Sequence, residues 1–275
     1  MSIYKNNVII EEDYVRKKYS KNVIDIFSLF ELCGFDNYCK IISYDDEFIR
    51  YEYKKYKDYY EVVKGSELID VVSLMHSKTT KYIEVDQEKY KDIYNSILGN
   101  INYLKKYYDN MIELIEFEEY MKPSSYLIAR NYSLILQSLE FASSKLEKWY
   151  KLVSNNLSDR VCVIHNNLSL DHFIYSDKSY LISFDRALVD TPILDLYKLY
   201  KNEFNNINFD ILFKKYNDVV LLSSEEKLLF FILISLTPKI EITNDEFNDC
   251  ININFVFKYI YKTLKFINKN NDLQL

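Results

Sequence analysis

The sequence predicts an α+β protein with a small β-rich N-terminal part and a larger, mainly helical remainder. Residues 7–18 and 38–53 alternate short β-prone runs with acidic turns, as hairpins do. From Ser66 onward the apolar residues recur mostly at helical spacing. The exception is residues 161–184, where three short runs rich in β-branched and aromatic residues indicate buried strands.

The N-terminal part is expected to hold a hairpin, a helix and a second hairpin. The first hairpin has its turn at residues 11–13, where three acidic side chains interrupt the apolar pattern. Ser20 is a candidate N-cap for the helix, and Gly34 can end it because glycine readily adopts the left-handed conformation that closes helices. The expected bounds are 7–18 for the first hairpin, 21–32 for the helix, and 38–44 with 48–53 for the second hairpin.

The helical remainder is expected to contain seven helices. The second carries an apolar stripe from Tyr90 to Ile115 that would face a core, and Trp149 lies in the last turns of the third. Ser223 and Glu226 have the spacing of a capping box at the start of the sixth. The expected bounds are 67–77, 86–118, 124–152, 193–203, 209–217, 224–236 and 245–268.

The composition of the chain limits the classes of partner that it could bind and the cellular compartment expected for it. A net charge of −6 gives no overall attraction to nucleic acid or to an anionic membrane. No apolar run approaches the roughly 18 residues that cross a bilayer, and the N-terminus lacks a signal-like region. The four scattered cysteines suggest reduced thiols. We therefore expect a cytoplasmic protein without a nucleic-acid partner or membrane insertion, which binds a small ligand or another protein of unknown identity.

The loop between the first two strands of residues 161–184 concentrates the polar residues of this region. It covers residues 165–172, reads His-Asn-Asn-Leu-Ser-Leu-Asp-His, and contains two of the chain's three histidines. A Ser-Asp-Lys-Ser turn at residues 176–179 leads into the third strand. This arrangement places a polar loop at the end of a buried strand, where binding and catalytic residues are often found.

This loop resembles the catalytic loop of the aminoglycoside phosphotransferase and choline kinase-like superfamily, particularly its spore-coat (CotS-like) branch. In that family His-Gly-Asp is followed after four residues by Asn, and a strand ending Ile-Asp-Phe or Ile-Asp-Trp comes after a hairpin. Here His165 takes the place of the loop histidine, Asn167 that of the catalytic aspartate, and His172 that of the metal-binding asparagine. Ser183, in an Ile-Ser-Phe sequence, replaces the second metal ligand.

The resemblance extends over nearly the whole chain. Residues 190–196 are similar to the family's Asp-x-Pro-x-x-Asp-Leu, which implies that Asp195 buttresses the loop. Leu74–His76 matches the Leu-His ending of a helix, and Pro123–Tyr126 fits the spore-coat branch. The resemblance implies a bilobal protein-kinase-like fold with an N-lobe at 1–53, a hinge at 54–65 and a helical C-lobe at 66–275 that contains the catalytic-loop hairpin 161–185.

The resemblance also implies candidate nucleotide-binding residues. Lys17 takes the place of the lysine that contacts the phosphates of ATP, with Asp25 or Glu31 as its helix partner. Lys18 is almost as good a candidate, and both lysines could equally be solvated strand ends. Glu52 lies where the hinge would meet adenine, although the tyrosines on either side of it could fill that space.

The chemistry of the replaced residues argues against metal-dependent phosphoryl transfer. Mg²⁺ prefers hard oxygen ligands, chiefly carboxylates, whereas Ser183 offers a neutral hydroxyl and the imidazole of His172 favours softer metals. Asn167 has no useful basicity. Only three glycines occur in the chain and none in its first 30 residues, where a phosphate-covering loop is expected.

Three functions remain open. The first is a bacterial pseudokinase that keeps the fold for binding or scaffolding. The second is a divergent small-molecule kinase that uses ATP with Mg²⁺ or Mn²⁺ through the relocated carboxylates Asp171 and Asp185, with Asp190 as a further candidate. The third is a protein-interaction module that uses the tyrosine-rich helical surface.

Two residues of the loop region have structural interpretations as well. Asp185 could cap the loop by pairing with Arg186 or with a backbone amide, and we favour this over a metal-binding role. His165 is expected to hydrogen-bond the loop backbone. A zinc site formed by His165, His172 and a cysteine is the alternative, although the cysteines lack the usual paired spacing.

Overall fold

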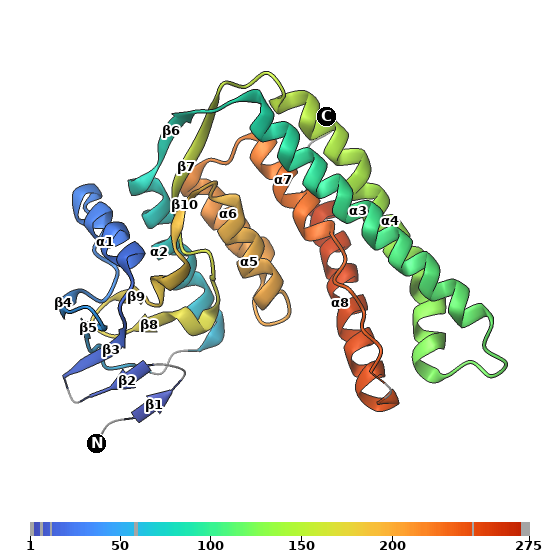
Figure 1. Cartoon of the computed structure of the whole chain (residues 1–275), viewed down its shortest axis with the longest axis horizontal. Helices are drawn as coiled ribbons and strands as arrows, with labels where there is room; N and C mark the ends of the chain where they lie inside the picture. Colours follow the sequence, from blue (N-terminus) through green and yellow to red (C-terminus); the bar gives the residue numbers. More distant parts are fainter. Residues whose placement is uncertain (1–2, 6–7, 12, 58–59, 244, 271–275) are drawn as a thin grey trace. The chain divides into compact units, whose positions relative to one another are not determined.

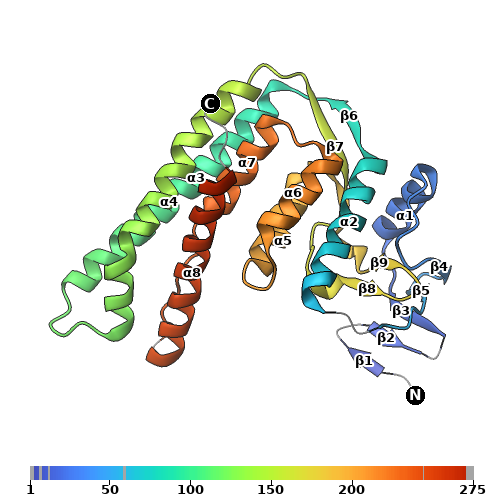
Figure 2. The same ribbon diagram turned by 180° about the vertical axis from the view of Figure 1, so that it is seen from behind.

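The computed structural model describes residues 3–5, 8–11, 13–57, 60–243 and 245–270. The chain divides into two compact units, one made of residues 1–83 and 160–221 and the other of residues 84–159 and 222–275. Small sheets belong to the first unit, and long helices dominate the second (Figure 1, Figure 2). None of the described helices is long and apolar enough to span a membrane.

A five-stranded antiparallel sheet forms the N-terminal part of the first unit. Both predicted hairpins are present within it, and a short strand before the first hairpin extends the sheet beyond the prediction. Glu12, in the predicted turn of the first hairpin, lies outside the described residues. In sheet order the strands are β1 (Ile3–Lys5), β2 (Val8–Ile10), β3 (Tyr14–Lys18), β5 (Phe48–Glu52) and β4 (Ile41–Tyr44).

Helix α1 (Lys21–Cys33) begins and ends where the sequence predicts. Gly34 has a φ of 67°, and its backbone N–H donates to the carbonyl of Glu31, so glycine closes the helix as expected. Ser20 occupies the N-cap position, but its side chain makes no capping hydrogen bond, contrary to the prediction. The buried face of the helix consists of Val23, Ile26, Phe27 and Phe30.

Helix α2 (Glu61–Thr79) is longer than predicted and begins inside the segment expected to be a hinge, part of which (residues 58–59) lies outside the described residues. Gly65 weakens the local helix propensity, which explains the late predicted start. Its lack of a side chain has a packing reason, because an added Cβ would lie 3.2 Å from Cγ2 of Ile207 and 3.5 Å from Cδ1 of Leu212. Helix α2 therefore packs closely against α6 (Phe209–Val220).

Two further sheets surround the loop of residues 165–172. Three strands pair in the order β10 (Leu188–Asp190), β7 (Ser158–Ile164) and β6 (Lys81–Glu84), while β8 (Phe173–Tyr175) and β9 (Ser179–Leu181) form a hairpin. The third predicted strand of this region ends earlier than expected, at Leu181. Ser183 adopts a left-handed backbone (φ 68°), and residues 184–186 form a 3-10 turn, so Asp185 does not lie on a continuing strand.

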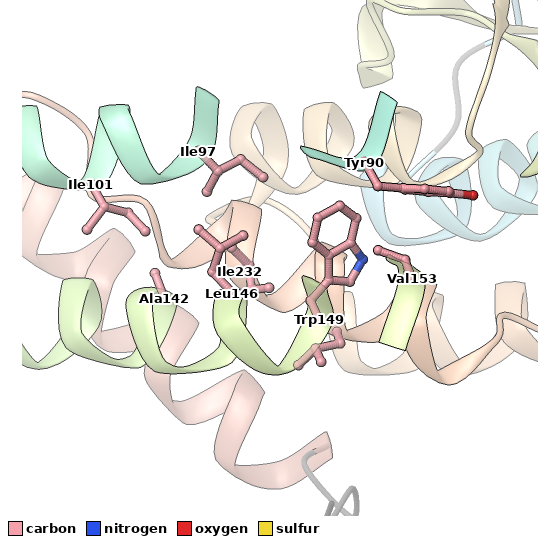
Figure 3. Packing of buried hydrophobic residues seen from close by; sticks show 9 residues of the cluster. Tyr90, Ile97, Ile101, Ala142, Leu146, Trp149, Val153 and Ile232 are labelled. Carbon is pink, nitrogen blue, oxygen red and sulfur yellow. The ribbon is translucent and has the colours of Figure 1, made fainter. Parts of the chain in front are cut away.

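In the described part of the second unit, three helices pack around α4 (Pro123–Val153). These are α3 (Gln87–Glu116), α7 (Ser224–Ser235) and α8 (Glu246–Asn270). Figure 3 shows apolar side chains of α3, α4 and α7 pointing toward one another, with Trp149 of the last turns of α4 buried among them. Both hydrogen bonds of the predicted capping box between Ser223 and Glu226 are present.

Candidate functional site

Helix α5 (Ile193–Glu203) holds the backbone of the loop that follows β7. The buried carboxylate of Asp195 accepts hydrogen bonds from the backbone N–H groups of His165 and Asn166, both at 2.7 Å. Two turns along the helix, Nδ2 of Asn202 donates to the carbonyl of Leu168 at 3.0 Å. These are the contacts expected of a residue that buttresses the loop.

Two more side chains of α5 complete this support. Nζ of Lys198 donates to the backbone carbonyl of Asn166 at 2.7 Å and also contacts its side-chain oxygen. The buried Glu203 accepts the backbone N–H of Leu170 at 2.9 Å. Sequence reasoning missed Lys198, Asn202 and Glu203, although their spacing after Asp195 places 195, 198 and 202 on one helical face and was a signal for polar contacts there.

His76 connects Asp195 to two other helices. Its Nε2 lies 3.1 Å from Oδ2 of Asp195, and its Nδ1 lies 2.7 Å from the hydroxyl of Tyr216 on α6. Because the carboxylate can only accept, we assign the proton to Nε2, which leaves Nδ1 to accept from Tyr216. Burial opposes ionisation of Asp195, but the hydrogen bond from His76 and the favourable charge interactions hold the pKa of this carboxyl below its usual value.

His165 lies fully buried beneath the loop. Its Nε2 donates to the carbonyl of Ile182 at 2.8 Å, a contact with the backbone of the kind expected for a loop scaffold. Its Nδ1 has no hydrogen-bond partner among the described residues. Burial lowers the pKa of His165, so the ring stays neutral, packed against the rings of Phe184 (5.0 Å between centroids) and His172 (5.2 Å).

The side chain of His172 hydrogen-bonds within the loop itself. Nδ1 of His172 lies 2.7 Å from the carbonyl of Asn167 and 3.1 Å from Oγ of Ser169, so this imidazole donates to the loop backbone. Asn166, at the glycine position of the motif, has a φ of 59°, and asparagine is among the residues that tolerate this conformation. The loop therefore keeps a tight turn although its glycine is absent.

Lys17 meets the loop region through the residues that follow β9. Its Nζ lies 3.0 Å from Oγ of Ser183 and 3.0 Å from Oδ2 of Asp185. The partner of Lys17 is thus Asp185, and not Asp25 or Glu31, whose side chains are exposed on α1. For the same reason, the predicted pairing of Asp185 with Arg186 or a backbone amide is wrong.

A cavity of about 190 Å³ lies beside this ion pair. It is lined mainly by apolar side chains of the sheet and of the segment around β9, together with Lys17, Ser183 and Asp185. Glu52 also lines it, but its carboxylate already accepts from the backbone N–H of Lys40 (3.0 Å) and pairs with Lys54 (3.2 Å). The apolar lining includes Val8, Ile10, Val15, Phe27, Ile174 and Leu181.

The cavity contains one thiol and one phenol that burial keeps uncharged. Burial raises the pKa of the Cys39 thiol to about 12, so this cysteine is not a thiolate at neutral pH. Burial also raises the pKa of the Tyr51 hydroxyl above its usual value. Charge at the cavity is therefore supplied by Lys17, Asp185 and the Glu52 pair.

The residues present do not fit a metal ion well. Within the described ranges, no group of three or more His, Cys, Asp or Glu side chains could hold one. Neither the zinc site of His165 and His172 with a cysteine nor a three-carboxylate site of Asp171, Asp185 and Asp190 is therefore formed. Asp171 is exposed on a 3-10 turn, and Asp185 is engaged by Lys17.

Similarity to known proteins is found in structure and not in sequence. No family model matches the chain, and no curated protein matches it either. A solved aminoglycoside phosphotransferase from Alicyclobacillus acidocaldarius aligns over 98% of this chain and 92% of its own, with a TM-score of 0.72 and 9% identity. The AMP-bound spectinomycin phosphotransferase APH(9)-Ia aligns over 96% and 87%, with a TM-score of 0.51 and 13% identity.

At such low identity these likenesses establish the fold alone. The N-terminal sheet with one helix, the loop between β7 and β8, and the mainly helical remainder agree with the architecture that the sequence predicts. The chain therefore has the bilobal protein-kinase-like fold of the aminoglycoside phosphotransferases.

Proposed function

We propose that this protein is a pseudokinase that binds a planar ligand in the cavity beside Lys17 and does not catalyse metal-dependent phosphoryl transfer. The observation that carries the proposal is the ion pair of Lys17 with Asp185, next to Ser183 at a metal-ligand position of the motif. The ammonium group of Lys17, which would otherwise be available to a phosphate, is already neutralised by the carboxylate of Asp185. The carboxylate that could replace a lost metal ligand is occupied by the same contact.

The loop of residues 165–172 favours this interpretation. The hydrogen bonds that hold its backbone are present, whereas the base and the metal ligands of the motif are replaced. Four side chains of α5 still satisfy the loop backbone. Asn167 cannot accept a proton from a substrate hydroxyl, and loss of a general base alone typically costs about 10² to 10⁴ in rate. A stable loop without a base is suited to holding a ligand and not to transferring phosphate.

The size and lining of the cavity suggest the kind of ligand. Sites for drug-sized ligands typically measure about 300–1,000 Å³, so a cavity of about 190 Å³ suits one ring system. Apolar side chains such as Val15 and Leu181 can pack against the faces of an aromatic base. The turn at residues 11–13 carries three acidic side chains and no glycine, which disfavours a triphosphate there. We infer that the cavity takes the base of a nucleoside and that phosphates add little affinity.

Isothermal titration of the wild type and of Asp185→Asn with adenosine and ATP, each with EDTA, Mg²⁺ or Mn²⁺, tests the proposal. Wild type should bind adenosine and ATP alike, with or without metal. Asp185→Asn frees Lys17 for phosphate, so its affinity for ATP should rise about fivefold, the equivalent of the roughly 1 kcal/mol of a partly exposed ion pair. Its affinity for adenosine should stay the same.

Asp171→Asn is the matched control, since Asp171 is exposed and has no ion pair among the described residues. It should bind both ligands as the wild type does. The divergent-kinase alternative makes the opposite prediction, because relocated carboxylates would make ATP binding depend on metal and both substitutions would abolish that dependence. Metal-dependent ATP binding by the wild type, or no binding of either ligand, would overturn the proposal.

A further inference from the structure

The second unit contains a groove at the end of the helical pair α3 and α4. It measures about 480 Å³ and is lined by residues of the last turns of α3 and the first turns of α4. Figure 1 shows these ends of the two helices side by side. The α3 wall follows the helical spacing of Tyr107, Met111 and Leu114, which share one face, and Glu118 lies just beyond the end of the helix. Ile128 of α4 and Ile242, which precedes α8, add apolar surface, and the remaining lining includes the polar side chains of Lys122, Ser124 and Ser125.

Hydrogen bonds connect the elements that line the groove. The backbone N–H and Oγ of Ser124 donate to the carboxylate of Glu246 at 2.5 and 3.0 Å. Oγ of Ser125 donates to Glu118 at 2.8 Å, and the Tyr107 hydroxyl donates to the carbonyl of Ile240. Because these contacts fix the walls in advance, an incoming ligand need not order them.

Large apolar side chains are exposed in the groove and in the chain segments that adjoin its lining residues. Leu114 is 71% exposed within it, and next to it in the chain Phe117 and Tyr120 are 82% and 83% exposed. Phe247, at the start of α8, is 74% exposed. Single exposed apolar residues are common, but a group of them beside an apolar groove marks an interaction surface.

The same surface holds a concentration of negative charge. Residues 113–122 contain four acidic residues and one basic residue, and residues 239–249 have the same composition. Each segment has a net charge of −3, although the carboxylate of Asp249 is buried and does not reach the surface. Lys122 is the basic residue that lines the groove, beside Glu118. Both segments contribute to the lining, through Glu118 and Ile242, and Ser124, which follows the first segment on α4, donates to Glu246 of the second. The field of the protein at this point therefore attracts cations.

We propose that this groove docks a basic amphipathic helix of a partner protein. An apolar stripe on such a helix would enter the groove beside Leu114 and Met111, while its lysine or arginine residues would face the acidic rim. Anionic membranes and nucleic acids carry the wrong charge for this surface. A second copy would bring the same negative charge to the contact, which disfavours self-docking at this site. The inference is independent of the cavity beside Lys17.

A model peptide provides a direct test. The probe is a fluorescent peptide of about four helical turns, made of Leu and Lys with Leu on one helical face. Fluorescence anisotropy at about 0.15 M salt should show saturable binding of this peptide, much weaker binding of a scrambled peptide of the same composition, and no binding of a Leu/Glu analogue. Leu114→Asp should weaken binding at least about tenfold.

Leu32→Asp is the matched control, because Leu32 is an exposed leucine on α1 and lies outside the groove. It should leave the affinity unchanged, and circular dichroism should confirm that both variants fold. Equal binding of the scrambled peptide, or equal loss in the two variants, would overturn the proposal. So would concentration-dependent dimers that Leu114→Asp abolishes, or binding to phosphatidylserine vesicles in place of the peptide.

Discussion

Asp195 accepts hydrogen bonds from His76 and from two backbone amides of the loop while it is completely buried. A buried carboxylate is destabilising unless its oxygens accept hydrogen bonds, and here the donors are the imidazole of His76 and two amides of the loop itself. Asp195 is thus the residue of α5 that connects the start of the loop to α2, while Lys198, Asn202 and Glu203 hold other parts of the loop. This explains how the loop can keep its shape although the residues at its catalytic positions differ from the motif.

Replacing Asp195 should therefore destabilise the protein strongly. Asp195→Asn removes the charge and one acceptor oxygen, which leaves buried donors unsatisfied and should lower the free energy of unfolding by roughly 3 kcal/mol. Urea denaturation measures this change. Asp171→Asn, an exposed substitution in the same loop, should change it by less than about 0.5 kcal/mol. A similar small effect of both would contradict the buttressing role.

His165 should make stability depend on pH. Its pKa is lowered in the folded state by burial, so below about 6.5 the unfolded chain takes up a proton that the folded protein resists. Stability should consequently fall as the pH drops below that value, by up to about 1.4 kcal/mol at about pH 5.5. The lowered pKa of Asp195 acts in the same direction, but its contribution is lost only in more acidic solution, below the ordinary aspartate pKa of about 3.9.

Urea denaturation of the wild type and of His165→Gln at about pH 7.5 and 5.5 isolates the histidine. Glutamine can still donate to the carbonyl of Ile182 but does not titrate. The wild type should lose more stability than the variant between the two pH values. If both lose the same amount, titration of His165 is not the cause.

Among the elements, most helices agree with the apolar periodicity of the sequence, and the differences have local reasons. Helix α2 begins earlier than predicted. Gly65 lowers the helix propensity of its first turns, but the packing of these turns against Ile207 and Leu212, which leaves little room for a side chain at position 65, favours the helix. The strand after the hairpin turn stops at Leu181 because Ser183 takes a left-handed backbone that propensity does not indicate. Local pattern predicts where an element forms, and packing decides where it ends.

The two helical glycines should respond differently to alanine. Gly99 on α3 has no atom within 4 Å of an added Cβ, so Gly99→Ala should raise the free energy of unfolding by about 0.5–1 kcal/mol through helix propensity. Gly65→Ala has the same propensity gain but places its Cβ 3.2 Å from Ile207, so its net gain should be smaller. Thermal and urea denaturation of the pair measure the difference. An equal gain would show that Ile207 moves aside freely.

At the scale of the whole molecule, the chain has the kinase-like fold, and in the proposed function the residues that would carry out phosphoryl transfer are replaced. The fold depends on buried apolar faces and on the polar contacts of Asp195. The chemistry would depend on a few side chains at the loop and after β9, namely Asn167, His172 and Ser183. Because these two sets hardly overlap, the second can change while the first is retained.

Restoring the motif should test whether the scaffold is still competent. The triple variant Asn167→Asp, His172→Asn and Ser183→Asp supplies a base and oxygen ligands, and aspartate tolerates the left-handed backbone at position 183. It should acquire ATP binding that depends on Mg²⁺, seen as a metal-dependent rise in melting temperature that the wild type lacks. No metal dependence in a folded triple variant would mean that the geometry of the loop itself has changed.

The sequence by itself determined the helices, the two N-terminal hairpins and the chemical identity of the loop, because these follow from spacing between near neighbours and from the loop's own residues. Only the tertiary structure decided that Asp185 pairs with Lys17, that Lys198 and Glu203 support the loop, and that Leu114 lines a groove. Such contacts join residues far apart in the chain. They arise from the packing of whole elements, which no local pattern specifies.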